Sequence, residues 1–139
     1  MGALPLIHKA SGIIIRDRKL LLSRSKARDT FVSPGGKLEA DETPQQALIR
    51  ELQEEQGIIV AIEDLELFGH FQAIAAGHEE QYTPIIMDVY MVKRYEGVPT
   101  PQSEIAENLW FDTSMQHVKQ GSIFEHEVIP RLKAQNLID

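Results

Sequence analysis

The sequence contains no cysteine at all. Without thiols the chain can have no disulfide framework, no thiolate metal site and no thiol nucleophile. A lack of cysteine also fits a protein that works in a reducing compartment. We therefore expect a cytoplasmic location.

Long hydrophobic runs are missing as well. The N-terminal stretch MGALPLIHKASG has no basic segment followed by an apolar run long enough for a signal peptide. Nowhere does the chain approach the ~18 consecutive apolar residues of a membrane span. We expect a soluble, unprocessed protein with no membrane partner.

Positive charge is scarce. The chain has 14 Lys and Arg against 21 Asp and Glu, which gives a formal net charge of −7. This balance argues against nonspecific attraction to nucleic acid or to an anionic membrane surface. A small anionic ligand that binds together with a divalent cation is still compatible with it.

What remains is the composition of an ordinary globular protein. The chain has 139 residues, of which 42% are hydrophobic and 25% are charged, with no long biased segment. This length is enough for one hydrophobic core and short for two. We expect a single domain over residues 1–139.

Short apolar runs rich in Ile, Val, Leu and aromatic residues predict the strands. The runs cover residues 13–15, 20–22, 31–32, 65–76, 81–93 and 109–111. The first two runs should form a hairpin, and Gly77-His78 should connect 65–76 to 81–93. Pro84 predicts an edge position or a bulge at the start of its strand.

Between these strands the sequence predicts irregular segments. Ser33–Gly36 combines proline with two glycines and is typical of a turn. Residues 95–104 contain two prolines and should form a loop.

The clearest helix runs from Pro44 to about Gln56. Thr43 is a good N-cap, Pro44 suits the first helical position, and Gln46 completes a capping box. Gly57 should end the helix in a left-handed conformation.

A second helix should start at Ser122, with Glu125 at its third position. Pro130 should interrupt it, because proline lacks the amide hydrogen that a helix interior needs.

Glu51, Glu54 and Glu55 lie within about 100° of arc on the first helix and border its apolar stripe. A solvated acidic face is the ordinary reading of such a run. However, these like charges repel one another, and the C-terminal end of a helix disfavours anions. Three oxygen ligands with no cysteine would suit a hard cation such as Mg²⁺ or Mn²⁺.

The surrounding residues carry a more specific pattern. Gly36 is followed after five residues by Glu42, and Glu42 after seven residues by Arg50-Glu51-Leu52; then come Glu54-Glu55 and Gly57-Ile58 at single-residue spacings. All of these positions match the Nudix box, G-x5-E-x7-R-E-U-x-E-E-x-G-U, in which U is aliphatic. The chain thus resembles the Nudix hydrolases, most closely the MutT-type nucleoside triphosphate pyrophosphohydrolases.

The resemblance implies an α/β (α+β) fold, in which a mixed β-sheet is sandwiched between helices around a loop-helix-loop motif. It implies that Glu51, Glu54 and Glu55 bind Mg²⁺ or Mn²⁺, and that a carbonyl of the pair Gly35-Gly36 completes the metal shell. Taken alone, a Gly-Gly pair is more often simply a turn.

The resemblance also assigns supporting roles. Arg50 would orient the neighbouring glutamates, Glu42 would be its structural partner, and Gly57 would end the helix. Arg24 and Lys37 could bind a phosphate of the substrate, although either could equally be a surface residue.

The general base is left open by the resemblance, because it can be a glutamate of the box or a carboxylate from a later loop. Glu104 and Glu107 are the loop candidates, and surface positions are the alternative for both. Phe31, Tyr82 and Trp110 could stack on a nucleobase, but aromatic residues on strands usually belong to the core.

The chain departs from the subfamily patterns in two places. The MutT-type asparagine near the C-terminal helix is replaced by Glu125 or His126, which weakens the case for 8-oxoguanine nucleotides. The proline of the ADP-ribose subgroup is also missing, because the first proline after the box is Pro84.

The expected activity is metal-dependent hydrolysis of a nucleoside diphosphate linked to another group, foremost a nucleoside triphosphate cleaved to a monophosphate and pyrophosphate. Hydrolysis of ADP-ribose, another sugar nucleotide or a dinucleoside polyphosphate is one alternative. A nucleotide sensor without catalysis is another. The partner is a small-molecule nucleotide, and the chain should be a monomer or a homodimer.

Overall fold

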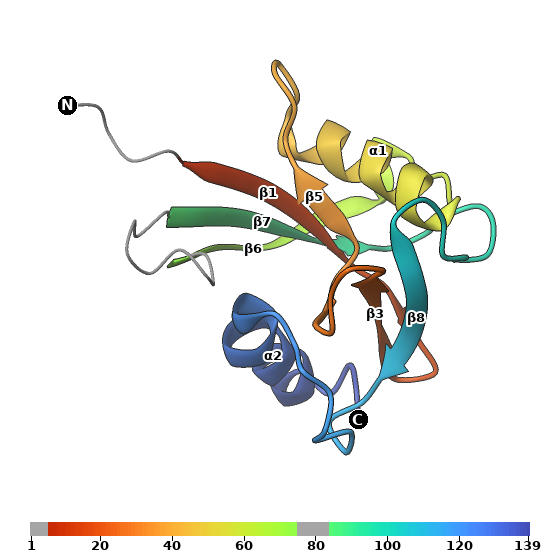
Figure 1. Ribbon diagram of the computed structural model, residues 1–139, viewed down its shortest axis with the longest axis vertical. Helices are drawn as coiled ribbons and strands as arrows, with labels where there is room; N and C mark the ends of the chain where they lie inside the picture. Colours follow the sequence, from red (N-terminus) through yellow and green to blue (C-terminus); the bar gives the residue numbers. More distant parts are fainter. Residues whose placement is uncertain (1–5, 75–83) are drawn as a thin grey trace.

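A computed structural model describes residues 6–74 and 84–139 of the chain (Figure 1). The elements follow the order β1 (Ile7–Ile13), β2 (Ile15–Arg16), β3 (Lys19–Ser25), β4 (Phe31–Val32), β5 (Gly35–Lys37), α1 (Pro44–Gln56), η1 (Ile62–Asp64), β6 (Leu65–Ile74), β7 (Pro84–Val92), β8 (Ile105–Phe111), η2 (Phe124–Val128) and α2 (Ile129–Ala134). The described helices and strands therefore include every helix predicted from the sequence, and one strand, β5, that was not predicted.

One sheet has the strand order β5-β1-β7-β6. Strand β1 runs parallel to β7, while β5 and β6 pair antiparallel with their neighbours. A register shift between Leu67 and Gly69 marks a bulge in β6. The sheet is thus mixed, as the resemblance implies.

The second sheet contains β2, β3 and β4, and β8 pairs with β3. The predicted hairpin is present, because Ile15 pairs with Leu20. The first apolar run is nevertheless divided: Ile13 belongs to β1 in the first sheet and Ile15 to β2 in the second.

The two hydrophobic clusters of the core lie under different helices. Ala47, Leu48 and Leu52 of α1 pack with one cluster, which includes Ala10 of β1. Val128, Ile129 and Leu132 of the C-terminal helix pack with the other, which includes Ile13. Figure 1 shows α1 and α2 on opposite sides of the strands, so the expected sandwich is confirmed.

The predicted turn at Ser33–Gly36 is wrong for its last two residues, Gly35 and Gly36. They begin the short strand β5, in which Gly36 pairs with Ala10 and Lys37 with Lys9. The glycine pair indicated a turn, but it serves a close approach between strands: a Cβ on Gly35 would lie 2.1 Å from the carbonyl oxygen of Ala10.

The prediction of an edge strand at Pro84 is wrong. Strand β7 lies between β1 and β6, and Pro84 is its first residue. Proline is tolerated at a strand start because its missing amide hydrogen is not needed there. The predicted connection Gly77-His78 lies outside the described residues.

Pro130 does not interrupt the second helix. The chain is helical from Ser122 to Ala134, and residues Phe124–Val128 form a π-helical turn, η2. In this turn the amide of Ile129 donates to the carbonyl of Phe124, five residues earlier. The wider turn explains how proline fits, because the clash that Pro130 would make with a regular α-helical carbonyl is relieved.

Among the described residues, the structure contains no helix with the length and apolarity needed to cross a membrane.

Candidate active site

Helix α1 presents the acidic cluster, and its ends are those that the sequence predicts. The Thr43 hydroxyl accepts a hydrogen bond from the amide of Gln46, and the Gln46 side chain accepts one from the amide of Thr43. Gly57 adopts a left-handed conformation with φ 67°, and its amide donates to Gln53. These caps fix where the helix ends and hence where its last turn of glutamates lies.

Arg50 lies at the centre of the cluster. Its Nε and Nη2 donate to the two carboxylate oxygens of Glu42 at 2.8 and 2.9 Å. Its Nη2 also donates to the carbonyl of Lys37 at 3.1 Å. This two-pronged contact ties the loop before α1 to the helix, and its hydrogen bonds lower the pKa of Glu42 to about 2.

The same guanidinium restrains two glutamates of the box. Arg50 Nη1 lies 2.7 Å from Glu51 Oε1 and 3.4 Å from Glu54 Oε2. Glu51 is mostly buried, with a side chain 15% exposed, whereas the Glu54 side chain is 54% exposed. These contacts are compatible with the orienting role that the resemblance implies for Arg50, and that role stays a prediction.

Glu55 is the most deeply buried carboxylate of the cluster, at 8% exposure. Burial raises its pKa to about 8, and Glu51, Glu104 and Glu54 add to the shift by repulsion. The amide of Gly35 opposes the shift by donating to Glu55 Oε1 at 2.9 Å. Burial also raises the pKa of Glu51, against the stabilising effect of Arg50.

Gly35 and Gly36 bring bare backbone against these carboxylates. A Cβ on Gly36 would lie 2.8 Å from the carboxyl carbon of Glu51. This distance is too short for a stable contact, so the Glu51 side chain would have to move. The glycine therefore leaves open the space next to Glu51 that any larger residue would fill.

Comparison with known proteins identifies the family to which the chain belongs. The model of the NUDIX domain matches residues 6–132. The chain belongs to the Nudix family.

Two relatives of this Nudix hydrolase are similar over most of its length. A "MutT-like protein" of Streptomyces ambofaciens is 35% identical over 92% of this chain and 79% of its own. An 8-oxo-dGTP diphosphatase of Haemophilus influenzae is 37% identical over 86% of this chain and 83% of its own.

The fold of the chain is also similar to that of a solved MutT protein. A solved MutT structure, from Aliivibrio salmonicida or Vibrio cholerae, superposes with a TM-score of 0.72 at 25% identity, covering 94% of this chain and 99% of that one. The MutT-type resemblance predicted from the sequence is confirmed.

Nudix hydrolases in general depend on a divalent metal, and the donors of this cluster fit one. All of them are oxygens, two of the carboxylates are buried next to each other, and Gly36 keeps the space beside Glu51 free. Yet nowhere in residues 6–74 and 84–139 do three acidic or histidine side chains already stand in a metal-binding arrangement.

The predicted convergence of three carboxylates is corrected accordingly. Arg50 holds Glu51 and Glu54, and Glu55 turns instead to the amide of Gly35. The metal-ligand roles of Glu51, Glu54, Glu55 and Gly36 stay predictions.

The structure separates the two loop carboxylates. Glu104 is near enough to the helix to raise the pKa of Glu51 and Glu55, as an addition to the larger effect of burial. Glu107 instead pairs with Arg24, whose Nε lies 2.9 Å from its carboxylate. Of the two candidates for the general base, Glu104 is thus the one whose charge acts on Glu51 and Glu55, and the role of either residue stays a prediction.

A pocket of about 360 Å³ lies beside the cluster, between β1, β5, β7 and the start of the C-terminal helix. Gly35, Gly36 and Lys37 line it. Substrate binding by Gly35 and Lys37 stays a prediction. Arg24 does not line it, because its guanidinium is held by Glu107 and by the carbonyl of Arg28.

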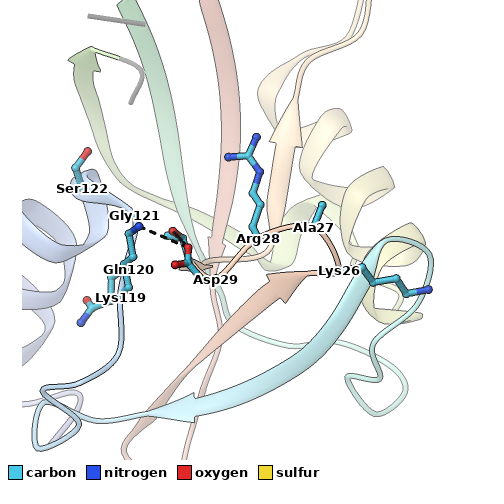
Figure 2. Close-up of a pocket in the computed structure, with 9 residues that line it drawn as sticks. Lys26, Ala27, Arg28, Asp29, Lys119, Gln120, Gly121 and Ser122 are labelled. Atoms are coloured by element: carbon cyan, nitrogen blue, oxygen red, sulfur yellow. Dashed lines mark hydrogen bonds and ion pairs between the residues drawn. The ribbon is translucent and has the colours of Figure 1, made fainter. Parts of the chain in front are cut away.

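A wider surface hollow of about 790 Å³ adjoins this pocket and shares Arg28, Thr30, Gly121 and Ser122 with it (Figure 2). Neither the pocket nor the hollow is lined by Phe31 or Trp110. Phe31 packs against the core under the C-terminal helix, and Trp110 packs near α1 with Arg16 over its ring at 4.1 Å. Tyr82 lies outside the described residues.

Lys9 and Arg28 are pocket residues that sequence reasoning missed. Lys9 gave no signal, because it lies in a mixed polar and apolar stretch before the first predicted strand, which begins at residue 13. Arg28 gave no signal, because it belongs to a loop whose path only the tertiary structure defines.

Proposed function

We propose that the chain is a single-domain Mg²⁺-dependent pyrophosphohydrolase, which cleaves a nucleoside triphosphate to a nucleoside monophosphate and pyrophosphate. The observation that carries the proposal is the burial of Glu51 and Glu55 side by side, next to the open backbone of Gly36. Two buried like charges are costly unless a cation compensates them.

Glu51, Glu54, Glu55 and the carbonyl of Gly36 would hold the metal. A bound Mg²⁺ would supply neutralisation of phosphate charge and polarisation of the phosphoryl oxygens. It would also allow a protein of net charge −7 to bind a polyanion.

The residues of the chain contribute position and proton transfer. Water attacks a phosphorus of the phosphoanhydride, the bridging phosphorus–oxygen bond breaks, and pyrophosphate leaves. Glu104 or a glutamate of the box accepts the proton of the attacking water. Arg50 holds Glu51 and Glu54 in place throughout, anchored in turn by Glu42.

The test is a nucleotide panel. The purified protein is incubated with Mg²⁺ and nucleoside triphosphates, ADP-ribose, sugar nucleotides and dinucleoside polyphosphates, and phosphate and pyrophosphate release are assayed. We expect turnover of a triphosphate and a loss of at least about 100-fold in kcat for Glu54→Gln. Glu66→Gln, which neutralises an exposed glutamate far from the cluster, is the matched control.

Each alternative outcome has a clear meaning. Turnover of sugar nucleotides or dinucleoside polyphosphates alone would replace the substrate but keep the chemistry. Tight nucleotide binding without hydrolysis would favour a sensor. Full activity in Glu54→Gln would contradict the proposed metal site.

We also propose a cytoplasmic protein that acts as a monomer or homodimer on this small-molecule nucleotide, without a nucleic-acid or membrane partner. Sedimentation of the purified protein tests the assembly state.

A further inference from the structure

The pocket beside the glutamate cluster is basic, although the chain as a whole is acidic. Its lining includes Lys9, Arg28 and Lys37 and, among the described residues, no aspartate or glutamate. The chain has 21 acidic and 14 basic side chains, so a pocket with three cations and no anion runs against its composition. Such a pocket has the potential to attract an anionic group.

Two of these cations lie on the face of the sheet opposite the glutamates. Lys9 pairs with Lys37 across β1 and β5, so both side chains point to one face, while the neighbouring pair Ala10 and Gly36 points to the other. Gly36 faces Glu51, and Lys9 faces the pocket. The lysines therefore lie on the pocket side of the sheet, whereas a side chain at Gly36 would meet Glu51 on the other side.

Lys9 is a partly buried cation, and the charge of Glu55 acts on it only as a minor effect. The lysine is partly buried between Ile7 and Ser11 on its own strand, and no hydrogen bond or ion pair joins its ammonium to any residue in 6–74 or 84–139. Burial lowers its pKa, the charges of Lys37 and Arg28 lower it further, and the charge of Glu55 opposes them as the smallest effect. A partly buried cation beside two other cations would be stabilised by an anionic ligand.

Arg28 approaches the same pocket from the connection between β3 and β4. Its backbone is fixed, because its carbonyl accepts a hydrogen bond from Arg24 at 2.9 Å and its amide donates to Ser25 at 3.1 Å. Figure 2 shows its side chain directed away from Asp29. Within the described residues its guanidinium forms no ion pair and so remains available to a ligand.

We propose that Lys9, Arg28 and Lys37 bind a second phosphate, carried by the organic group of the substrate and distinct from the phosphoanhydride that is cleaved. The proposal rests on the hydrolase function above and narrows its substrate to a di- or triphosphate whose sugar is itself phosphorylated. A phosphate monoester has a charge of about −1.5 to −2 at pH 7, so three cations suit it better than a neutral base or a carboxylate. The pocket, at about 360 Å³, is at the small end of ligand sites and matches a sugar phosphate.

The experiment measures binding without metal and without turnover. Ribose 5-phosphate, ribose and glucuronate are titrated by calorimetry into the full chain in EDTA, where metal-mediated phosphate binding is excluded. We expect ribose 5-phosphate to bind and the other two to bind at least about tenfold more weakly. We expect Lys9→Met to raise the Kd of ribose 5-phosphate about tenfold or more.

Two further variants keep the result interpretable. Arg28→Gln changes an exposed residue, so it tests the subsite even if Lys9→Met fails to fold. Lys93→Met removes the same charge from an exposed site and should leave the Kd unchanged within about twofold. Equal binding of ribose, equal binding of glucuronate, or an unchanged Kd in both pocket variants would overturn the proposal.

Assays of turnover separate this proposal from the hydrolase function. If nucleotides are hydrolysed but ribose 5-phosphate binding does not depend on Lys9 and Arg28, the subsite is wrong and the function stands. If no nucleotide is hydrolysed but binding depends on these two residues, the subsite stands and the function is wrong.

Discussion

Gly35 and Gly36 are neighbours, yet they are needed for different reasons. Gly35 has φ 144°, and a Cβ there would lie 2.1 Å from a backbone oxygen of β1. The atoms nearest to a Cβ on Gly36 would belong to the Glu51 carboxylate, at the end of a flexible side chain, and not to the backbone. The first glycine is required by the fold and the second by the site.

We therefore expect the two alanine variants to differ in kind. Gly35→Ala should lower the free energy of unfolding by at least about 2 kcal/mol, because neither its φ nor the strand contact can adjust cheaply. Gly36→Ala should keep its stability but lose about 100-fold in kcat, because the Glu51 carboxylate is displaced. Urea denaturation and steady-state kinetics measure both. A Gly36→Ala enzyme with normal kcat would show that the position of Glu51 is not important.

At the scale of secondary-structure elements, a buried polar network joins helix α1 to the second sheet. Gln56, with 0% exposure, donates to Ser23 and Asn108 at 2.8 and 2.9 Å and accepts from Asn108 at 2.7 Å. A buried amide with all of these partners fixes the end of the helix against β3 and β8.

Replacing this amide should destabilise the protein. Gln56→Leu keeps the approximate volume but removes the acceptor of Asn108 Nδ2, while the Ser23 hydroxyl still donates to Asn108 Oδ1 at 3.0 Å. The unpaired amide of Asn108 should cost about 1–3 kcal/mol. Gln53→Leu makes the same change at an exposed position of α1 and is the control. Urea denaturation of both variants measures the difference, and equal stability would mean that the network contributes nothing.

An ion pair at the end of the β3–β8 ladder also depends on pH, because Lys19 begins β3 and Asp112 directly follows β8. Hydrogen bonds from Lys19 and Ser114 lower the pKa of Asp112 to about 2. A carboxylate with a lowered folded pKa stabilises the protein fully above its unfolded pKa of about 4, and this contribution is lost as pH falls toward 2. The urea midpoint of the wild type should thus fall more steeply over this range than that of Asp112→Asn. Parallel pH profiles would contradict the assignment.

At the scale of the whole molecule, the two helices and the sheets form the frame that holds the acidic cluster next to the pocket. A ligand that binds only the folded state stabilises it by mass action. Mg²⁺ should therefore raise the melting temperature, by an amount equivalent to about 2.7 kcal/mol when its concentration is 100 times its Kd.

A thermal-shift assay tests this prediction. The wild type is melted in EDTA, in MgCl₂ and in NaCl of equal ionic strength, so that screening is separated from binding. Glu51→Gln should abolish the Mg²⁺-specific shift, whereas Glu66→Gln should retain it. A shift of equal size in NaCl would mean that no specific cation site exists.

Much of this protein could be predicted from local sequence. The capping box at Thr43, the left-handed Gly57 and the spacing of the glutamates define α1 and its acidic side, because a helix brings residues three and four apart together. The hydrogen bonds of its two caps join residues close together in the sequence. The family followed from the same short segment.

The arrangement of the pocket could not be predicted in this way. Lys9 and Lys37 meet only because β5 pairs with β1, and the glycine pair that makes this pairing possible indicated a turn. Arg24 and Arg28 differ by four positions, but one is held by Glu107 and the other lines the pocket. Sequence spacing does not determine such differences in an irregular loop.

The sequence by itself determined the helix, the presence of the Nudix motif and the chemistry of its oxygen donors, because all three depend on residues close together in the chain. Only the tertiary structure decided which carboxylates are buried, that Arg50 restrains Glu51 and Glu54, and that three cations line one pocket. Those features depend on strand pairing and packing between distant segments, whose electrostatic consequences arise only once the chain has folded.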